Sequence, residues 1–248
     1  MRQRIALATS LILALTITIT GQPLNNVTAN ANANSKREEL LEGTEAAKVI
    51  AHLGDLARPV LRERPKQMRQ PGYQPTPLLV QKLVEAQKLT VANNKRVDQL
   101  KAALQPVLDY HGRSQMPIYV LLSDQPKAYL VECAVLFITT RMMLISTDEE
   151  LRGIVAHELA HEYVWEERKQ AKQLKDGQKM RECELFCDAL AAFTLKEIGD
   201  DPASYGRILV RLTIIGINAG SAMKQESDTH PSLHARKKLN KFLCQRLD

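Results

Sequence analysis

Apolar and polar positions follow two different periods along the chain. From 78 to 104, apolar residues recur every three or four positions, which predicts a long amphipathic helix with a break near the Asn-Asn pair at 93–94. The middle of the chain changes to short apolar runs rich in β-branched residues, which predict strands at 117–122, 129–131 and 134–140. A small sheet within a largely helical chain is therefore expected.

The C-terminal part of the chain returns to the helical period. Thr147, followed three residues later by Glu150, fits a capping box, so a helix should begin there and run to about Arg168. A polar connector is expected at 169–177. Further helices are predicted at 178–198, 202–219 and 231–246. Helices, a small sheet and helices again indicate an α+β fold.

The N-terminal residues have the pattern of an export signal. Arg2 and Arg4 precede an uncharged run at 5–20, and the polar stretch after it ends in two Ala-x-Ala frames at 29–33. We predict a signal peptide at 1–33, with an uncleaved N-terminal anchor as the alternative. The mature protein would then be periplasmic or extracellular. It would have no transmembrane span, because no later run is apolar enough, and peripheral membrane association stays open.

Two segments follow the predicted signal. Residues 34–77 are expected to hold a helix at about 38–57 and then a proline-rich loop, which is either a lid or a simple surface crossing. Residues 78–248 form the predicted catalytic domain. The composition is that of a globular protein, with 44% hydrophobic and 25% charged residues. The net charge of +6 is small and no aromatic-basic cluster accompanies it, so no nucleic-acid partner is expected.

Export would permit disulfide bonds between the four cysteines. These are Cys133, Cys183, Cys187 and Cys244. Three pairings are possible and the spacing does not choose between them, while buried thiols are the alternative.

A metal-binding motif lies inside the predicted capped helix, at His157-Glu158-Leu159-Ala160-His161. Histidines four apart are about 40° from each other around a helix, so both imidazoles can reach one ion, with Glu158 beside them. Catalytic zinc takes three protein ligands and keeps one open position. The candidates for the third ligand on the downstream helix are Glu182, Glu184, Asp188, Cys183 and Cys187.

Glu184 and Asp188 are the most favourable pair among these candidates. They are four residues apart and share a helix face. Glu184 would bind zinc, and Asp188 would accept a hydrogen bond from the distal nitrogen of a ligand histidine. Solvated helix charges are the alternative for both.

These residues together resemble the gluzincin metallopeptidases and, more narrowly, the HtpX-like family, which includes the CAAX prenyl endopeptidases. Further matching stretches, in the same order, are Ala128 with Tyr129, the strand 135–140 with 142–144, and 229–232 with Arg236. The similarity covers about 97–239. It departs from the family at 130–134, where a small-residue turn is usual, and in lacking membrane spans. The chain therefore resembles a soluble, exported branch with a zincin-like fold, in which a small sheet with an edge strand packs on a helical domain.

The resemblance implies a role for each matching residue. One Zn²⁺ per chain would be held by His157, His161 and Glu184, with Asp188 orienting His157. Glu158 would be the general base and then the acid. Two further positions extend the site: His230, near the open zinc position and the oxyanion, and the sheet edge at Ile138 and Thr139, which would pair with the backbone of a polypeptide substrate.

We therefore predict a zinc-dependent endopeptidase that acts on exported or misfolded proteins. A non-catalytic, zinc-stabilised binding or chaperone-like module is one alternative, although it would not need Glu158. A zinc hydrolase of a non-protein amide is a second, less suited to an edge strand. Lipid-modified substrates are disfavoured because membrane helices are missing.

Overall fold

The computed structural model describes residues 76–88, 90–92, 95–218 and 229–247. The predicted signal peptide at 1–33, the helix at 38–57 and nearly all of the proline-rich loop lie outside these residues. Within the described part of the chain, no helix has both the length and the apolar character needed to cross a membrane.

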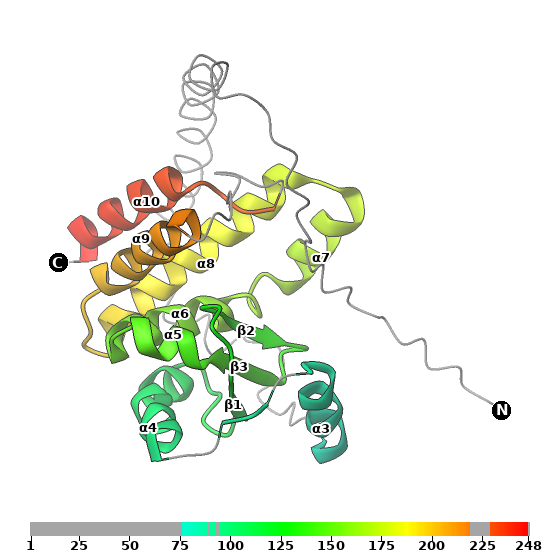
Figure 1. Cartoon of the computed structure of the whole chain (residues 1–248). Helices are drawn as coiled ribbons and strands as arrows, with labels where there is room; N and C mark the ends of the chain where they lie inside the picture. Colours follow the sequence, from blue (N-terminus) through cyan, green and yellow to red (C-terminus); the bar gives the residue numbers. More distant parts are fainter. Residues whose placement is uncertain (1–75, 89, 93–94, 219–228, 248) are drawn as a thin grey trace, which may run out of the picture. The chain divides into compact units, whose positions relative to one another are not determined.

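The described elements alternate as an α+β fold, which confirms the predicted fold class (Figure 1). In chain order they are α3 (Pro77–Ala86), α4 (Lys95–Tyr110), β1 (Ile118–Leu121), β2 (Ala128–Val131), β3 (Val135–Thr139), α5 (Thr140–Ile145), α6 (Asp148–Ala160), α7 (Trp165–Leu174), α8 (Gly177–Glu197), α9 (Ala203–Asn218) and α10 (Leu233–Leu247). The three predicted strands are therefore all present, each within a residue or two of its expected bounds.

The sheet is small and mixed, with strand order β1-β3-β2. β3 pairs parallel with β1 and antiparallel with β2, and all five of its residues are buried. The prediction that Ile138 and Thr139 form a substrate-binding edge is wrong, because neighbouring strands already occupy both sides of β3. β2 is half-buried and, among the described residues, pairs with β3 alone, so the exposed edge lies there.

The long helix predicted from 78 to 104 is two helices. α3 ends at Ala86 and α4 begins at Lys95 and continues to Tyr110. Between them, the backbone N–H of Ala92 donates to the carbonyl of Val120, and the N–H of Leu122 donates to the carbonyl of Thr90, both at 2.8 Å. Pairing with β1 outweighs the local helical spacing here.

The helix that carries the metal motif also ends earlier than expected. α6 stops at Ala160, residues 161–164 form a turn, and α7 runs through most of the predicted polar connector. Two side chains of the turn are held by residues that directly follow α4. Arg113 Nε donates to Glu162 at 3.1 Å, and the Tyr163 hydroxyl lies 2.8 Å from His111 Nδ1. These long-range contacts redirect the chain after His161.

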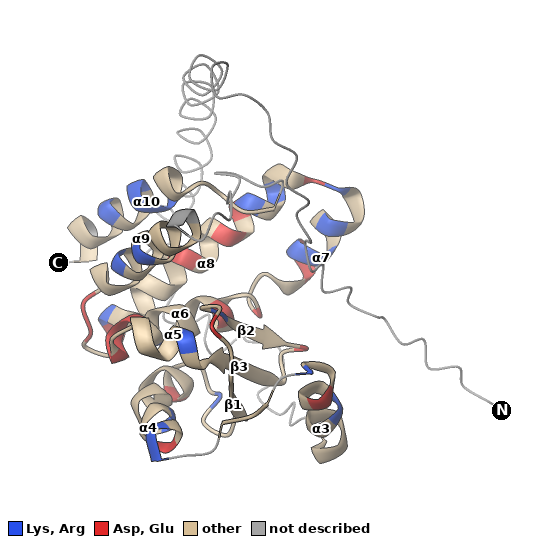
Figure 2. Ribbon diagram, viewed as in Figure 1, with Lys and Arg blue, Asp and Glu red and all other residues tan. Residues whose placement is uncertain are grey.

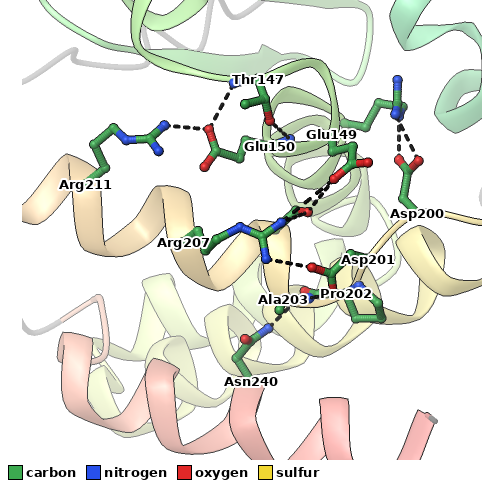
Figure 3. Close-up of polar contacts among 12 residues, drawn as sticks. Thr147, Glu149, Glu150, Asp200, Asp201, Pro202, Ala203, Arg207, Arg211 and Asn240 are labelled. Carbon is green, nitrogen blue, oxygen red and sulfur yellow. Dashed lines mark hydrogen bonds and ion pairs between the residues drawn. The ribbon is translucent and has the colours of Figure 1, made fainter.

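The start of α6 agrees with the sequence and is fixed by polar contacts (Figure 3). Thr147 and Glu150 form the predicted capping box. Glu150 also accepts from Arg211 of α9 at 2.5 Å, and Arg152 donates to Asp200, just after α8. α6 is therefore tied at its N-terminal end to the elements around it.

Two apolar clusters hold α6 and α8 against each other. One joins α4, the sheet, α6 and α9, with Leu104, Val155 and Tyr205 among its fully or nearly fully buried members. The other joins α8 to α10 through residues such as Leu185 and Leu239. Because α6 packs along α8, side chains from the two helices can meet between them.

Candidate metal centre

Two helices bring four potential ligands together. Ligand atoms of His157, Glu158 and His161 all lie within 4.8 Å of one another. From α8, Glu184 Oε2 lies 3.5 Å from His157 Nε2, and Glu184 Oε1 lies 3.9 Å from His161 Nε2. Tetrahedral zinc with bonds of about 2.0–2.1 Å separates its ligand atoms by about 3.3–3.5 Å. The two imidazoles and the Glu184 carboxylate are thus close to the spacing that zinc requires.

The Glu184 carboxylate has an unsatisfied oxygen. Its residue is 2% exposed, and Oε1 finds no hydrogen-bond partner among the described residues. A guanidinium nitrogen of Arg168 lies 3.2 Å from the same oxygen, close enough for an ion pair but not aligned as a hydrogen bond. A buried carboxylate oxygen in this state is suited to a cation. The residues present therefore fit a zinc ion.

His157 is held from behind by a charged network. Its Nδ1 lies 2.9 Å from both Asp188 Oδ1 and the Tyr205 hydroxyl. Arg236 donates two hydrogen bonds to Asp188, at 2.7 and 2.6 Å, and one to Tyr205 at 2.7 Å. Arg236 comes from α10, which has basic but no acidic residues (Figure 2). A proton on Nδ1 leaves Nε2 of His157 available to a metal.

His161 has a different partner. Its Nδ1 lies 3.3 Å from the sulfur of Cys187, which is fully buried. Cys183 and Cys187 are both free thiols. Neither therefore forms one of the disulfide bonds that export would permit.

Glu158 lies between the metal ligands and the sheet. Its Oε2 accepts a hydrogen bond from the backbone N–H of Leu130, on β2, at 3.3 Å. Burial, assisted by the negative charge of Glu184, raises the pKa of Glu158 against the opposing effect of His157. A carboxylate with a raised pKa beside a metal site is suited to accepting and returning a proton.

Residues 93–175 match the sequence model of Peptidase family M48. The match covers about one third of the chain and shows similarity to this family over that region. The match supports the resemblance to HtpX-like metallopeptidases, a generally zinc-dependent family whose members act on polypeptides. The matched region includes the motif at 157–161 but ends before Glu184, so the third ligand rests on the geometry above. No curated protein matches the chain.

The surrounding charges give the two imidazoles very different pKa values. Burial lowers the pKa of His157, but hydrogen bonds and charges from Asp188 and Glu184 outweigh it and raise that pKa to about 9. For His161, burial and the charge of His157 lower the pKa to about 3. The same network acts on Asp188. Burial raises the pKa of Asp188, but the charges and hydrogen bonds of Arg236 and His157 outweigh burial and lower that pKa to about 2.

A cavity of about 590 Å³ opens on the metal ligands. His230 is exposed and lines it together with Glu158 and Trp165. Part of the wall is apolar, formed by Leu130, Met142, Ile154, Leu209 and Leu212. The wall on the β2 side includes Lys127 and Ala128. The cavity thus joins the metal ligands to the exposed edge strand.

The structure gathers most of the predicted site residues at this cavity. They are His157, Glu158, His161, Glu184 and His230 as lining residues, with Asp188 behind His157. Ile138 and Thr139 are 0% and 1% exposed and do not line it.

Several contributors escaped the sequence analysis. Tyr205 is one tyrosine on an apolar helix face, and Arg168 lies at the predicted end of the helix that carries the metal motif, so neither carried a local signal. Arg236 belongs to a stretch that matches the family, but the resemblance gave it no definite role. Its ion pair with Asp188 depends on how α10 packs on α8, which the spacing of residues does not specify.

Proposed function

We propose that the protein is a zinc-dependent endopeptidase of the M48 type, in which Glu158 moves the proton. The observation that carries the proposal is the convergence of His157, His161 and the unsatisfied Glu184 carboxylate on one point, with Glu158 at its side. A purely structural zinc site has four protein ligands and needs no base, whereas this one offers three ligands and a carboxylate.

His157, His161 and Glu184 would hold the ion. Bound zinc would polarise the peptide carbonyl and lower the pKa of water. Arg168, whose guanidinium lies 3.2 Å from Glu184 Oε1, pairs with that carboxylate beside the cavity in the metal-free chain.

Glu158 performs the proton transfers in this mechanism. It accepts a proton from the attacking water and returns it to the leaving nitrogen of the cleaved peptide bond. The Leu130 N–H orients its carboxylate. The raised pKa of Glu158 brings it nearer to the range in which both transfers are efficient.

β2 is the proposed docking strand for the substrate, in place of Ile138 and Thr139. Its outer edge has no strand partner among the described residues, and three of its residues, Ala128, Tyr129 and Leu130, line the cavity. An extended polypeptide added to β2 would gain backbone hydrogen bonds with little sequence preference. His230 would donate to the developing oxyanion from the exposed rim.

We also propose that the substrates are exported or misfolded polypeptides and that the enzyme works in the periplasm or outside the cell. This part rests on the export pattern at 1–33 and on the weak sequence preference of strand docking.

The test compares the full chain with Glu158→Gln, Glu184→Ala and the matched control Glu182→Gln, which changes an α8 glutamate paired with Lys179. Zinc content and cleavage of an unfolded protein are measured for each. Glu158→Gln should keep zinc and lose about 10²–10⁴-fold in rate, since it lacks the proton acceptor. Glu184→Ala should lose zinc, and Glu182→Gln should behave as wild type.

Wild-type turnover by Glu158→Gln would overturn the mechanism. Zinc binding without cleavage by the wild type would instead favour the non-catalytic binding module.

A further inference from the structure

We propose that Cys187 is the positioning residue of His161, accepting a hydrogen bond from Nδ1–H so that Nε2 faces the metal. The proposal rests on the proposed function, because it takes His161 as a zinc ligand. Its basis is the distance of 3.3 Å between Cys187 Sγ and His161 Nδ1, with Cys187 fully buried.

The position of Cys187 on α8 explains the contact. Glu184, Cys187 and Asp188 are spaced by three and four residues, so one turn of α8 presents all three toward α6. Glu184 meets both Nε2 atoms, Asp188 meets Nδ1 of His157, and Cys187 meets Nδ1 of His161. Each histidine therefore has its own supporting side chain from the same turn.

Cys187 is not itself a candidate ligand in this arrangement. Its sulfur contacts Nδ1 of His161, whereas Glu184 is approached by the Nε2 atom of that ring. The metal-binding edge and the supported edge of the imidazole are thus distinct. When Nε2 binds a metal, the ring proton must be on Nδ1, and sulfur must be the acceptor.

Sulfur is a weak acceptor, which sets the size of the expected effect. Loss of an outer partner of a ligand histidine costs about 10–100-fold in metal affinity when that partner is a strong one. Cys187→Ala leaves Nδ1–H buried without a partner, so we expect about a 3–10-fold weaker zinc affinity.

The experiment measures the zinc dissociation constant by chelator competition for the wild type, Cys187→Ala, Cys187→Ser and Cys183→Ala. The control removes another buried sulfur one helical turn away, in the apolar cluster between α8 and α10. Cys187→Ala should weaken zinc binding and Cys183→Ala should not, while Cys187→Ser should recover part of the loss because its hydroxyl can accept. Nitrogen-15 NMR of the zinc-loaded protein should show the His161 Nδ1–H signal shifted in both Cys187 variants and unmoved in Cys183→Ala.

Equal dissociation constants and an unmoved His161 signal in Cys187→Ala would overturn the inference. If Cys187→Ala does not fold, the serine variant and its NMR signal decide between the same two results. A wild type that binds no zinc would refute the proposed function instead.

Discussion

The two ligand histidines of α6 lie one turn apart but have unlike surroundings. His157 is inside the helix, and its Nδ1 faces Asp188, which Arg236 and Tyr205 hold in place. His161 is the C-cap residue that follows the helix, and it faces a neutral thiol. A motif can thus specify the spacing of two ligands while their supporting partners differ completely in charge.

Charge also determines the metal-free state of each ring. The carboxylates near His157 favour its protonated form, whereas His161 has its pKa lowered to about 3 and stays neutral. Zinc must therefore displace a proton from one ligand and not from the other. The following experiments test this asymmetry.

The largest effect is expected from Asp188→Asn. This change removes the charge that pairs with Arg236 and leaves a largely buried guanidinium without its counter-ion, which costs about 3 kcal/mol in the free energy of unfolding. Zinc affinity should fall about 10–100-fold, because His157 loses its carboxylate partner. Urea unfolding of the metal-free protein and chelator competition measure the two quantities.

If Asp188→Asn lost no more free energy of unfolding than Cys187→Ala, the supporting partners of the two histidines would not differ as described. Asp176→Asn, which alters a carboxylate at the N-terminal cap of α8, is the matched control for the chemical change, and it should leave zinc affinity unchanged.

Tyr205→Phe should have a smaller effect on the same network. The hydroxyl donates to Asp188 at 2.6 Å and receives a hydrogen bond from Arg236 at 2.7 Å, so its loss leaves these groups only partly satisfied. We expect a loss of about 1–3 kcal/mol in unfolding free energy. The control is Tyr119→Phe on β1. Equal unfolding curves for the two variants would show that the Tyr205 hydroxyl does not stabilise the network.

The smallest effect concerns protons. His157 has a pKa of about 9, so at lower pH it is protonated in the metal-free protein. Raising the pH toward 9 removes this competing proton and strengthens zinc binding, by at most about tenfold per pH unit. His161, with a pKa of about 3, contributes no proton in this range. Titration calorimetry at pH 6 in buffers of different ionisation enthalpy should show about one proton released. The Glu158→Gln variant is used so that its carboxyl does not titrate.

Release of two protons would mean that the histidines are equivalent in the metal-free protein. In Asp188→Asn the released proton should largely disappear, because the largest contribution that raises the His157 pKa is gone.

Local sequence alone determined a large part of this protein. Helical periodicity encodes features that depend on residues three or four positions apart. These features are the capping box at Thr147 and Glu150, the histidines four apart, and the spacing of Glu184 and Asp188. Strand positions were predictable for the same reason, since alternation and β-branched runs are local properties.

Tertiary structure alone decided the order of the strands, the end of the metal helix and the partners of its histidines. β3 takes the centre of the sheet through long-range pairing, which buries Ile138 and Thr139 and leaves β2 at the edge. α6 ends at Ala160 because Arg113 and His111 anchor the next residues from about fifty positions away. Such contacts have no periodic signature in the sequence, because they depend on how separate elements pack rather than on the conformation of one.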